Sequence, residues 1–308
     1  MLSEFRQDRF PILLYHRFVS SQSDLSRYPG TENIFSITAA GFEEQLSSLA
    51  RQGYRTVGPD QVMAFLTAAQ DLPDRPIMIT VDDGWRSNID IMLPILERFR
   101  FGCTIFVTTG PEAWIFRKFR GLDAGLTANE VFDLHRRGVN VGSHTVTHPY
   151  LIEMTDQQIR REFIESKAVL EEWTGAPCRF LSIPGNFYNR RIAGIARECG
   201  YEAVFTANVG TVSRATDLFD INRLIVEGAF TLREFEANLR PTAIITRKAI
   251  AWVKKQPPRF LGASRYMAIR EVLFNSPLRH LFIMKRLKAI ATAGICFVLI
   301  VIGWWLFS

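Results

Sequence analysis

The sequence has few cysteines and no cysteine motif. Its four cysteines, Cys103, Cys178, Cys199 and Cys296, show no CxxC spacing. This argues against a cysteine metal site or a disulfide framework, and it favours a reducing compartment. Internal repeats and low-complexity segments are also missing. With 47% hydrophobic residues, the chain is not mainly disordered, and its 308 residues are enough for one large domain or two small ones.

Charge is unevenly distributed along the chain. Residues 240–288 contain twelve Lys or Arg and one acid, Glu271, whereas residues 289–308 carry no charge. Subtracting this segment's +11 from the net charge of +6 leaves −5 for residues 1–239. We therefore predict a globular domain over residues 1–239, a basic juxtamembrane segment over 240–288 and an uncharged end over 289–308.

The uncharged residues 289–308 predict a single transmembrane helix. As a helix they would extend about 30 Å, the thickness of a bilayer's hydrocarbon core. Trp304 and Trp305 lie where an interfacial aromatic belt is expected. A buried core helix is the alternative, but such a helix usually keeps a polar stripe.

Two features predict that the globular domain is cytoplasmic. Lys285, Arg286 and Lys288 precede the span, and positive flanks stay on the cytoplasmic side. The first ten residues, MLSEFRQDRF, have no apolar stretch like that of a signal peptide. Nucleic-acid binding is not expected, because the basic charge adjoins the span and no binding motif is recognisable. The other basic residues contact anionic headgroups or form a solvated helix face: Arg247, Lys248, Lys254, Lys255, Arg259 and Arg265.

Short apolar runs alternate with helical patterns up to about residue 235. Strands are expected at residues 12–15, 77–81, 103–109, 139–142 and 179–183, and helices at 39–51, 59–69, 87–99, 128–137 and 156–173. This alternation indicates a parallel sheet with both faces covered. About seven such units without an obvious break favour an α/β fold of the (β/α) barrel type over two open sheets.

Polar side chains follow the predicted strands, where parallel barrels carry their chemistry. His16 follows the first strand, Asp82 and Asp83 follow the strand at 77–81, and His144 and His148 follow the strand at 139–142. Three of the five histidines thus gather with the Asp-Asp pair at one rim. We predict the active site there.

Two imidazoles and one carboxylate with an open position suit a hydrolytic zinc ion, which activates its bound water. His144 and His148 are four residues apart, but the branched residues between them and the following proline predict a turn, not a helix. An HxxxH pair alone is more often two unrelated surface histidines. Its position beside the Asp-Asp pair makes the metal interpretation strong.

The neighbouring aspartates need different roles. One can bind the metal while the other accepts a proton from the water. The alternative for Asp82 and Asp83 is a simple turn with Gly84, since Asp-Gly is a common turn signal. The turn and the site can coexist.

These segments resemble the motifs of the polysaccharide deacetylases, the carbohydrate esterase family 4-like group that shares the NodB homology domain. TVDDG at 80–84 resembles the TFDDG motif, and SHTVTHP at 143–149 contains the H-[ST]-x-x-H motif. SIPGNFYN at 182–189 is similar to a Pro-Gly-rich third motif, and PILLYHRF at 11–18 to an N-terminal strand of many members. The resemblance covers about residues 10–235, and its first two motifs together are highly specific.

The resemblance implies a distorted (β/α) barrel and a metal-dependent hydrolase that removes an N-acetyl or similar acyl group from an amino sugar. It implies Asp83, His144 and His148 as ligands of a divalent ion, expected to be zinc, and Asp82 as general base. The oxyanion would be held by the metal and a backbone N–H near Gly185. That glycine lies in the third-motif turn with Pro184 and Asn186.

The sequence departs from the family pattern at two places. Ser182 stands where many members carry an arginine that orients the base, and Arg223 is either its substitute or a surface residue. The late Leu-x-His motif that usually supplies the general acid is missing, and His280 is the only histidine after His148. His16 is either the replacement acid or a buried structural histidine.

Two alternatives to the deacetylase remain. One is an inactive membrane-tethered carbohydrate-binding protein, suggested by the missing motif. The other is a metal-dependent phosphoesterase, which would more often need a second metal. A cytoplasmic domain held at the membrane cannot reach finished extracellular polymer. We therefore expect an acylated amino sugar on a polyprenyl phosphate or similar lipid carrier.

Overall fold

A parallel β-sheet forms the centre of the computed structural model, which describes residues 9–28, 34–240, 243–248 and 262–275. The strands of this sheet run in the order β10-β9-β8-β7-β6-β2-β12, and every neighbouring pair is parallel. They are β2 (Ile12–Tyr15), β6 (Pro76–Val81), β7 (Thr104–Val107), β8 (Asn140–Ser143), β9 (Phe180–Ser182), β10 (Ala203–Phe205) and β12 (Leu224–Ile225). The parallel sheet that was predicted from the alternation of strands and helices is thus confirmed.

The sheet curves until its two ends meet through one segment. Ile221 donates its N–H to Val204 O at 2.9 Å, and Thr206 donates to Ile221 O at 2.9 Å, which links β10 to the chain just before β12. On the other side, Leu224 of β12 pairs with Leu13 of β2. Because the same short segment bonds to the last and the first strand, the architecture is the barrel-like (β/α) fold that was expected.

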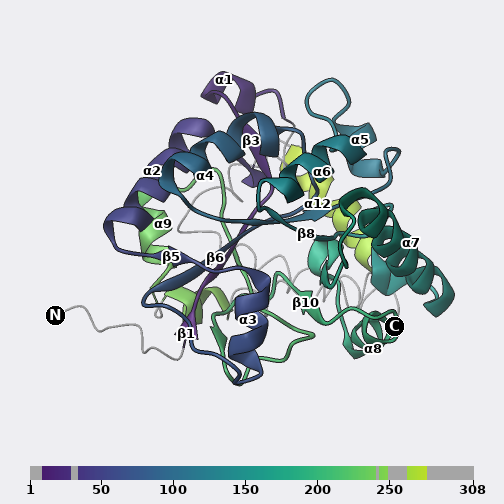
Figure 1. Cartoon of the computed structure of the whole chain (residues 1–308). Helices are drawn as coiled ribbons and strands as arrows, with labels where there is room; N and C mark the ends of the chain where they lie inside the picture. Colours follow the sequence, from purple (N-terminus) through teal and green to yellow (C-terminus); the bar gives the residue numbers. More distant parts are fainter. Residues whose placement is uncertain (1–8, 29–33, 241–242, 249–261, 276–308) are drawn as a thin grey trace, which may run out of the picture.

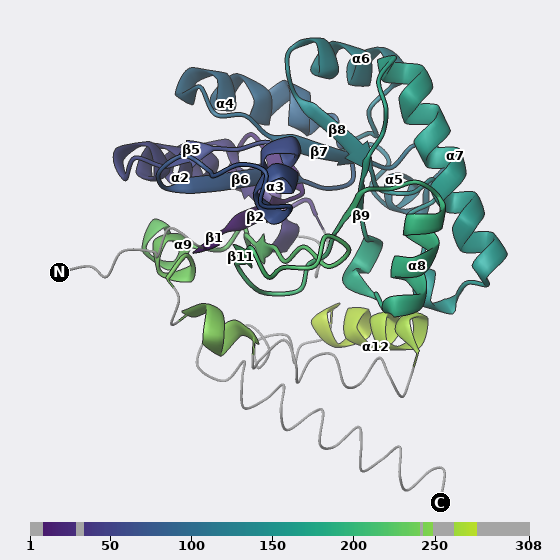
Figure 2. The same cartoon turned by 60° about the horizontal axis from the view of Figure 1, so that its bottom comes forward.

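Helices cover the outside of this sheet (Figures 1 and 2). They are α2 (Ala39–Arg51), α4 (Leu93–Phe99), α6 (Ala128–Arg136), α7 (Asp156–Thr174), α8 (Arg190–Glu198) and α9 (Leu232–Asn238). Shorter elements complete the fold: β1 (Arg9–Phe10), β3 (Arg17–Val19), β4 (Ser36–Thr38), β5 (Arg55–Thr56), β11 (Val212–Ser213), α1 (Gln22–Leu25), α3 (Pro59–Leu66), α5 (Trp114–Lys118) and α12 (Ala263–Asn275).

The strands contribute side chains to two apolar clusters, because successive side chains point to opposite faces of a sheet. One cluster takes Ile12, Met78, Phe106, Phe180 and Phe205. The other, under the helices, takes the alternating residues Leu13, Ile79, Ile105, Leu181 and Val204. The rings of Phe106 and Phe205 lie 5.1 Å apart although two strands separate β7 from β10. Such a contact requires a curved sheet with a filled interior.

Most of the expected element boundaries are confirmed within one or two residues. The strand at 12–15 and the helix at 39–51 match at both ends, and Thr38 caps that helix by accepting the N–H of Gly41. The strand expected at 103–109 ends at Val107. The next two residues leave the ladder, because Thr108 donates to Asp83 O and Thr109 to Thr145 O.

One expected helix is wrong in its first half. The pattern at 87–99 predicted a continuous α-helix, but residues Asn88–Met92 form a π-helical turn and α4 starts only at Leu93. Pro94 has no N–H to donate to the preceding turn, so a regular α-helix cannot run through it with all its bonds. The wider turn accommodates the proline.

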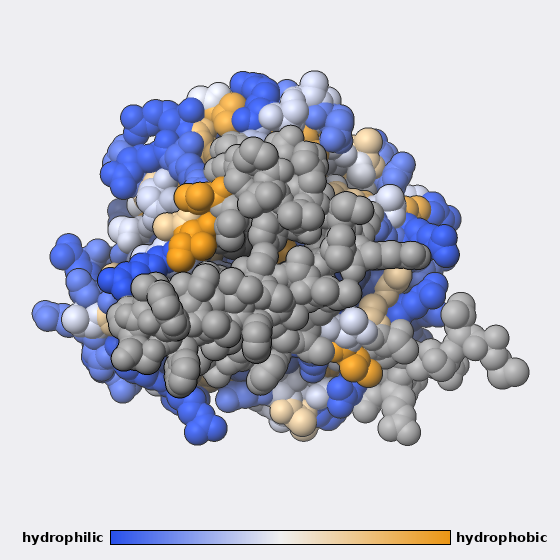
Figure 3. Space-filling model, turned by 180° about the vertical axis from the view of Figure 1, so that it is seen from behind, coloured by the Kyte–Doolittle hydropathy of each residue, from blue (hydrophilic) through white to orange (hydrophobic). Residues whose placement is uncertain are grey.

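The predicted anchor at 289–308 lies outside the described residues. Within the described part of the chain, no helix has both the length and the apolar character needed to cross a bilayer. The described residues visible around the grey atoms in Figure 3 are mainly hydrophilic, with a few separate hydrophobic patches.

Two described parts of the basic segment pack against the barrel. Ser264 of α12 donates its backbone N–H and its hydroxyl to Glu153, and Glu271 pairs with Lys118 at 3.0 Å. Arg247 donates to Ile225 O at 2.9 Å, and burial lowers the pKa of its guanidinium. Arg247 is half-buried and bonded to the fold, so its side chain does not belong to a fully solvated helix face. A contact of the basic segment with anionic headgroups stays a prediction.

Candidate active site

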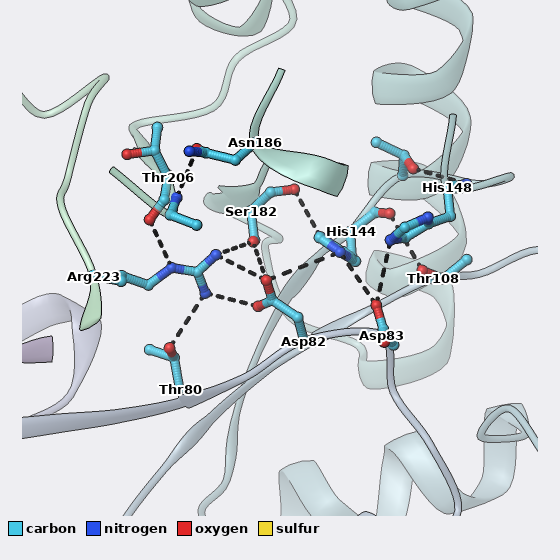
Figure 4. A network of polar contacts seen from close by, with 12 residues as sticks. Thr80, Asp82, Asp83, Thr108, His144, His148, Ser182, Asn186, Thr206 and Arg223 are labelled. Carbon is cyan, nitrogen blue, oxygen red and sulfur yellow. Dashed lines mark hydrogen bonds and ion pairs between the residues drawn. The ribbon is translucent and has the colours of Figure 1, made fainter. Parts of the chain in front are cut away.

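The carboxyl ends of the central strands bring the predicted site residues to one rim. Figure 4 shows the two aspartates, the two histidines that follow β8, and Arg223 there. Tyr15 and Val81 are paired in the β2·β6 ladder, so His16 and Asp82 leave neighbouring strands at the same level. The N–H of Asp82 donates to Tyr15 O at 3.0 Å. His144 follows β8 directly, and its N–H donates to Val107 O of β7 at 2.8 Å.

Asp82 is held by a buried, two-pronged ion pair. Arg223 donates from both terminal nitrogens, to Oδ1 at 2.7 Å and to Oδ2 at 2.8 Å, and Ser182 donates its hydroxyl to Oδ2 at 2.8 Å. Burial raises the pKa of Asp82, but the charge and hydrogen bonds of Arg223 outweigh this and leave the pKa below its usual value. The carboxylate is therefore ionised and fixed in orientation.

Arg223 has an acceptor for each of its five N–H groups. Besides the two bonds to Asp82, it donates to Thr206 O at 3.0 Å, to Thr80 Oγ1 at 3.2 Å and to Ser182 Oγ at 2.6 Å. Its exposed fraction is 0%, so the surface interpretation of Arg223 is wrong. A guanidinium can be buried in this way only when its donors and its charge are all compensated.

Asp83, His144 and His148 form a second cluster beside this pair. Oδ1 of Asp83 lies 3.4 Å from Nε2 of His144 and 3.4 Å from Nε2 of His148. Burial raises the pKa of Asp83, but its contacts with the two imidazoles hold the pKa well below the usual value. Burial lowers the pKa of His144, yet the nearby aspartates leave it raised.

The two histidines are presented by a turn, as predicted. Thr145 and His148 have positive φ angles of 69° and 57°, which no helix contains. Nδ1 of His144 contacts Ser182 O at 2.9 Å, which directs Nε2 toward Asp83. A backbone partner on one ring nitrogen is the usual way to orient a metal-ligating histidine.

Sequence reasoning missed the residue that stabilises this turn. Glu162 of α7 is buried and accepts the N–H groups of Val146 and Thr147 at 2.8 and 2.9 Å, as well as the Thr147 hydroxyl at 2.6 Å. Glu162 stands three residues after Ile159 and next to Phe163, on the helix face that the pattern predicts to be buried, and a charged residue at such a position was the available signal. Glu162 replaces bonds that the irregular backbone cannot make internally.

His16 faces the same cluster. Burial lowers the pKa of its imidazole, whereas the charges of Asp83 and Asp82 raise it. Its Nδ1 is buried and has no hydrogen-bond partner among the described residues, while its ring lies 4.8 Å from that of Phe35. The backbone carbonyl of His16 accepts from the Asn88 side chain at 3.0 Å. The backbone of His16 is thus fixed by Asn88, and Nδ1 of its imidazole has no internal hydrogen bond among the described residues.

The third-motif turn forms the other side of the rim. Gly185 has a φ of 62° and Asn186 a φ of 59°. Asn186 fixes the turn, because its Oδ1 accepts the N–H of Ala207 at 2.8 Å and its amide donates to Asn208 at 3.2 Å. Pro184 is buried and Gly185 is exposed, so the turn presents backbone at the surface of the site.

Three half-buried aromatic rings lie between His148 and Gly185. Trp114 donates its indole N–H to His148 O at 2.7 Å, and its ring lies 6.5 Å from Tyr150. The rings of Tyr150 and Phe187 are 5.4 Å apart and meet edge to face. We call Trp114, Tyr150 and Phe187 the aromatic rim.

The donor set at Asp83 fits a divalent cation. One carboxylate and two imidazole atoms can all lie within 4.8 Å of one another. Tetrahedral zinc with bonds of about 2.0–2.1 Å separates neighbouring ligand atoms by about 3.4 Å, as Asp83 Oδ1 is separated from each imidazole here. In the described part of the chain, this is the one such group of three His, Cys, Asp or Glu residues.

The sequence comparisons agree with the resemblance found in the motifs. Residues 69–204 match the family model described as Polysaccharide deacetylase. The Bacillus subtilis (strain 168) protein YxkH, whose name assigns it to the polysaccharide deacetylases, is 27% identical over 229 residues, which are 74% of this chain and 75% of that protein. A peptidoglycan-N-acetylglucosamine deacetylase of Bacillus cereus is 29% identical over 132 residues, which are 42% of this chain and 56% of that protein.

Solved structures share the fold. The deacetylase PplD of Streptococcus pyogenes, in complex with acetate, superposes with a TM-score of 0.65 at 23% identity and covers 76% of this chain and 99% of its own. IcaB from Ammonifex degensii has a TM-score of 0.61 at 22% identity, covering 79% and 96%. These structures confirm the fold, and the sequence matches given above carry the family resemblance.

The buried Arg223–Asp82 pair predicts a large loss of stability when the arginine is removed. Arg223→Met should cost about 3–5 kcal/mol of unfolding free energy, because it leaves a buried carboxylate without its cation. Chemical denaturation measures this value. Arg120→Met is the matched control, because its ion pair with Glu112 is about 70% exposed on both sides and should contribute at most about 1 kcal/mol. Equal losses in the two variants would contradict the interpretation.

Proposed function

We propose that this chain, which belongs to the polysaccharide deacetylase family, is a metal-dependent hydrolase that removes an N-acetyl or similar acyl group from an amino sugar. One observation carries the proposal: two adjacent carboxylates are held differently at one rim. Asp82 is bonded to a buried arginine, whereas Asp83 faces two imidazoles. Hydrolysis of an amide by an ion-activated water needs one group to take a proton and another to hold the ion.

Asp83, His144 and His148 would hold the divalent cation, for which zinc is the expected ion. When bound, a cation of this kind polarises the acyl carbonyl and lowers the pKa of a coordinated water. The bond from His144 to Ser182 O supports this role, since it leaves Nε2 free to coordinate.

Asp82 would act as the general base. Its Oδ2 lies 3.9 Å from Nε2 of His144, so the carboxylate borders the proposed ligands. The lowered pKa keeps it ionised near neutral pH, and it can accept the proton of the attacking water. Arg223 and Ser182 would be positioning residues, because both act through the orientation of this carboxylate.

His16 would donate a proton to the departing amine as the carbon–nitrogen bond breaks. The charges of Asp83 and Asp82 favour the protonated imidazole that this transfer needs, although burial opposes them and leaves the pKa of His16 lowered. On the opposite side, a backbone N–H near Gly185 would bind the oxyanion.

The substrate we propose is an acylated amino sugar carried by a polyprenyl phosphate or similar lipid. The aromatic rim supports a sugar, because aromatic faces with polar edges line binding sites of this kind. The Bacillus cereus relative is named for an N-acetylglucosamine unit, which supports the same chemical class. The lipid carrier follows from the predicted anchor at 289–308 and the predicted cytoplasmic side of the domain.

Neither alternative gains support from the described site. An inactive carbohydrate-binding protein would have no need for an ionised, buried Asp82 beside three proposed ligands. A two-metal phosphoesterase would need further ligands next to Asp83, and the described residues offer a single group of three.

Exchange of the proposed base should separate turnover from metal binding. Asp82→Asn should keep the bound metal and abolish most hydrolysis of an N-acetylated amino sugar, because an amide cannot accept the water's proton. His144→Ala should lose metal and hydrolysis together. Metal analysis of the purified variants, combined with release of acetate, measures both quantities. Metal loss in Asp82→Asn with retention in His144→Ala would mean that the ligands are assigned wrongly.

The proposed acid predicts a dependence on the leaving group. His16→Ala should slow amide cleavage by about 10²- to 10⁴-fold with metal binding intact. An activated aryl acetate releases a phenolate that needs little protonation, so its hydrolysis should fall much less. The rates on both substrates are measured with the same enzyme preparation, so that differences in the amount of folded enzyme affect both rates equally. Equal losses with metal and fold retained would contradict an acid role for His16.

The predicted orientation of the anchor can be tested with the full chain. The three basic residues before the span predict that the globular domain remains intact when protease is added to right-side-out membrane vesicles. Digestion is expected after the vesicles are opened or inverted. Cleavage of the domain in sealed right-side-out vesicles would overturn both the cytoplasmic location and the argument for a lipid-linked substrate.

A further inference from the structure

Asp83 shares its two oxygens between different partners. Oδ1 faces the imidazoles of His144 and His148, as described above. Oδ2 accepts a hydrogen bond from the indole N–H of Trp85, two residues along the chain, at 2.8 Å. Trp85 is 1% exposed, so this bond is shielded from water. The indole thus occupies the oxygen that points away from the proposed ligands.

We propose that Trp85 is a positioning residue that fixes Asp83 as a ligand through Oδ1 alone. This inference rests on the proposed function, because it assigns a task to Trp85 only if Asp83 binds a metal. A carboxylate without a partner on its second oxygen can rotate and present either oxygen or both. The indole N–H can donate but cannot accept, so it selects one orientation of an ionised carboxylate. Hydrogen bonds of this kind orient metal ligands and raise metal affinity.

The backbone around Asp83 needs such support. Asp83 has a φ of 78° and Gly84 a φ of 76°, and the first of these is an uncommon conformation for a residue with a side chain. A Cβ on Gly84 would come within 3.1 Å of the Val107 side chain, so the turn lies tightly against β7. Strained conformations persist only where surrounding contacts over-determine them. The bond from Trp85 is one of these contacts.

The indole is itself held by a buried aromatic cluster. Arg17 places its guanidinium carbon 4.0 Å from the centre of the Trp85 ring, 4.1 Å from that of Phe119 and 4.5 Å from that of Tyr28. Phe116 meets Trp85 edge to face at 5.0 Å. A ring packed between a cation and aromatic edges has little freedom to turn, so its N–H stays aimed at Asp83.

The cluster also connects this orientation to the proposed acid. Arg17 follows His16 directly, so one peptide unit carries the imidazole on the site side and the guanidinium on the Trp85 side. The segment after Trp85 returns to the same place, because Asn88 donates to His16 O and Ser87 accepts from Phe18 N. The loop after β6 therefore positions both Asp83 and the backbone of His16.

The test measures zinc affinity directly, not activity. The metal-free full-length chain, kept in neutral detergent, is titrated with Zn²⁺ in competition with a chromophoric chelator. Trp85→Phe removes the N–H donor and should weaken zinc binding by about 10- to 100-fold. Because the smaller ring also changes packing, a second variant carries 3-benzothienylalanine at position 85, which keeps the indole shape and replaces the N–H by sulfur. It should show the same loss.

Tyr28→Phe is the matched control. It removes a hydrogen-bond donor from the same cluster, but this hydroxyl donates to Leu122 O at 3.2 Å and not to a proposed ligand. Its zinc affinity should equal that of the unmodified chain, even if its unfolding free energy falls. If Trp85 had a purely structural role, the position-85 variants would behave like Tyr28→Phe. Their unfolding free energy would fall, but the zinc affinity of the folded protein would not change.

The outcomes distinguish this inference from the proposed function. Wild-type affinity in both position-85 variants would overturn the inference while leaving the metal site in place. Weaker zinc binding in Trp85→Phe but not in the benzothienyl variant would assign the effect to packing and overturn the role of the indole N–H as donor. No zinc binding by the unmodified chain would overturn the metal site itself, and the inference with it.

Discussion

The rest of the structure depends on one buried interaction, the ion pair between Arg223 and Asp82. Arg223 lies on the segment that bonds β10 on one side and β2 on the other, so it is placed where the curved sheet closes. From there its five N–H groups reach Thr80, Asp82, Ser182 and Thr206, which belong to or follow β6, β9 and β10. The same side chain thus links the strands and orients the carboxylate of Asp82. A substitution of Arg223 therefore changes both the stability of the fold and the geometry of the proposed base.

The layer below explains why the barrel tolerates a buried charge. Phe106, Phe180 and Phe205 fill the interior beneath the ion pair, and the Arg223 guanidinium lies 5.5 Å from the Phe106 ring. An apolar interior excludes water and strengthens the attraction between the two charges, but it also penalises any donor left unpaired. The complete pairing of Arg223 satisfies that condition. Its partners Asp82, Ser182 and Thr206 lie at or just beyond strand ends, and Thr80 lies one residue inside the end of β6.

The sequence was sufficient for the strands, the turn between the histidines and the rim on which the site lies, because these depend on local patterns. Apolar runs fix strands to within one or two residues, and parallel strands put their ends at one edge. The roles of Ser182, Glu162 and Trp85 could not be predicted in the same way. Ser182 meets Asp82 across 100 residues, and Glu162 meets a turn that forms only in the fold. From the sequence, Ser182 in place of the family's arginine left open which group orients the base. In the structure, the small serine side chain leaves room for the guanidinium of Arg223, which pairs with Asp82.

Charge balance explains why two adjacent aspartates can have different tasks. Asp82 has a permanent cation as its partner, because a guanidinium does not lose its proton in proteins. Asp83 has only imidazoles and an indole, and imidazoles are cationic only when protonated. A buried carboxylate needs a positive partner. The charge of Asp83 can therefore be compensated in two ways, by protonation of the histidines or by a cation bound between the three side chains. The raised pKa of His144 expresses the first alternative. Asp83, His144 and His148 already offer three ligand atoms within 4.8 Å of one another, which suits the second alternative and supports assigning the base to Asp82 and the ligand to Asp83.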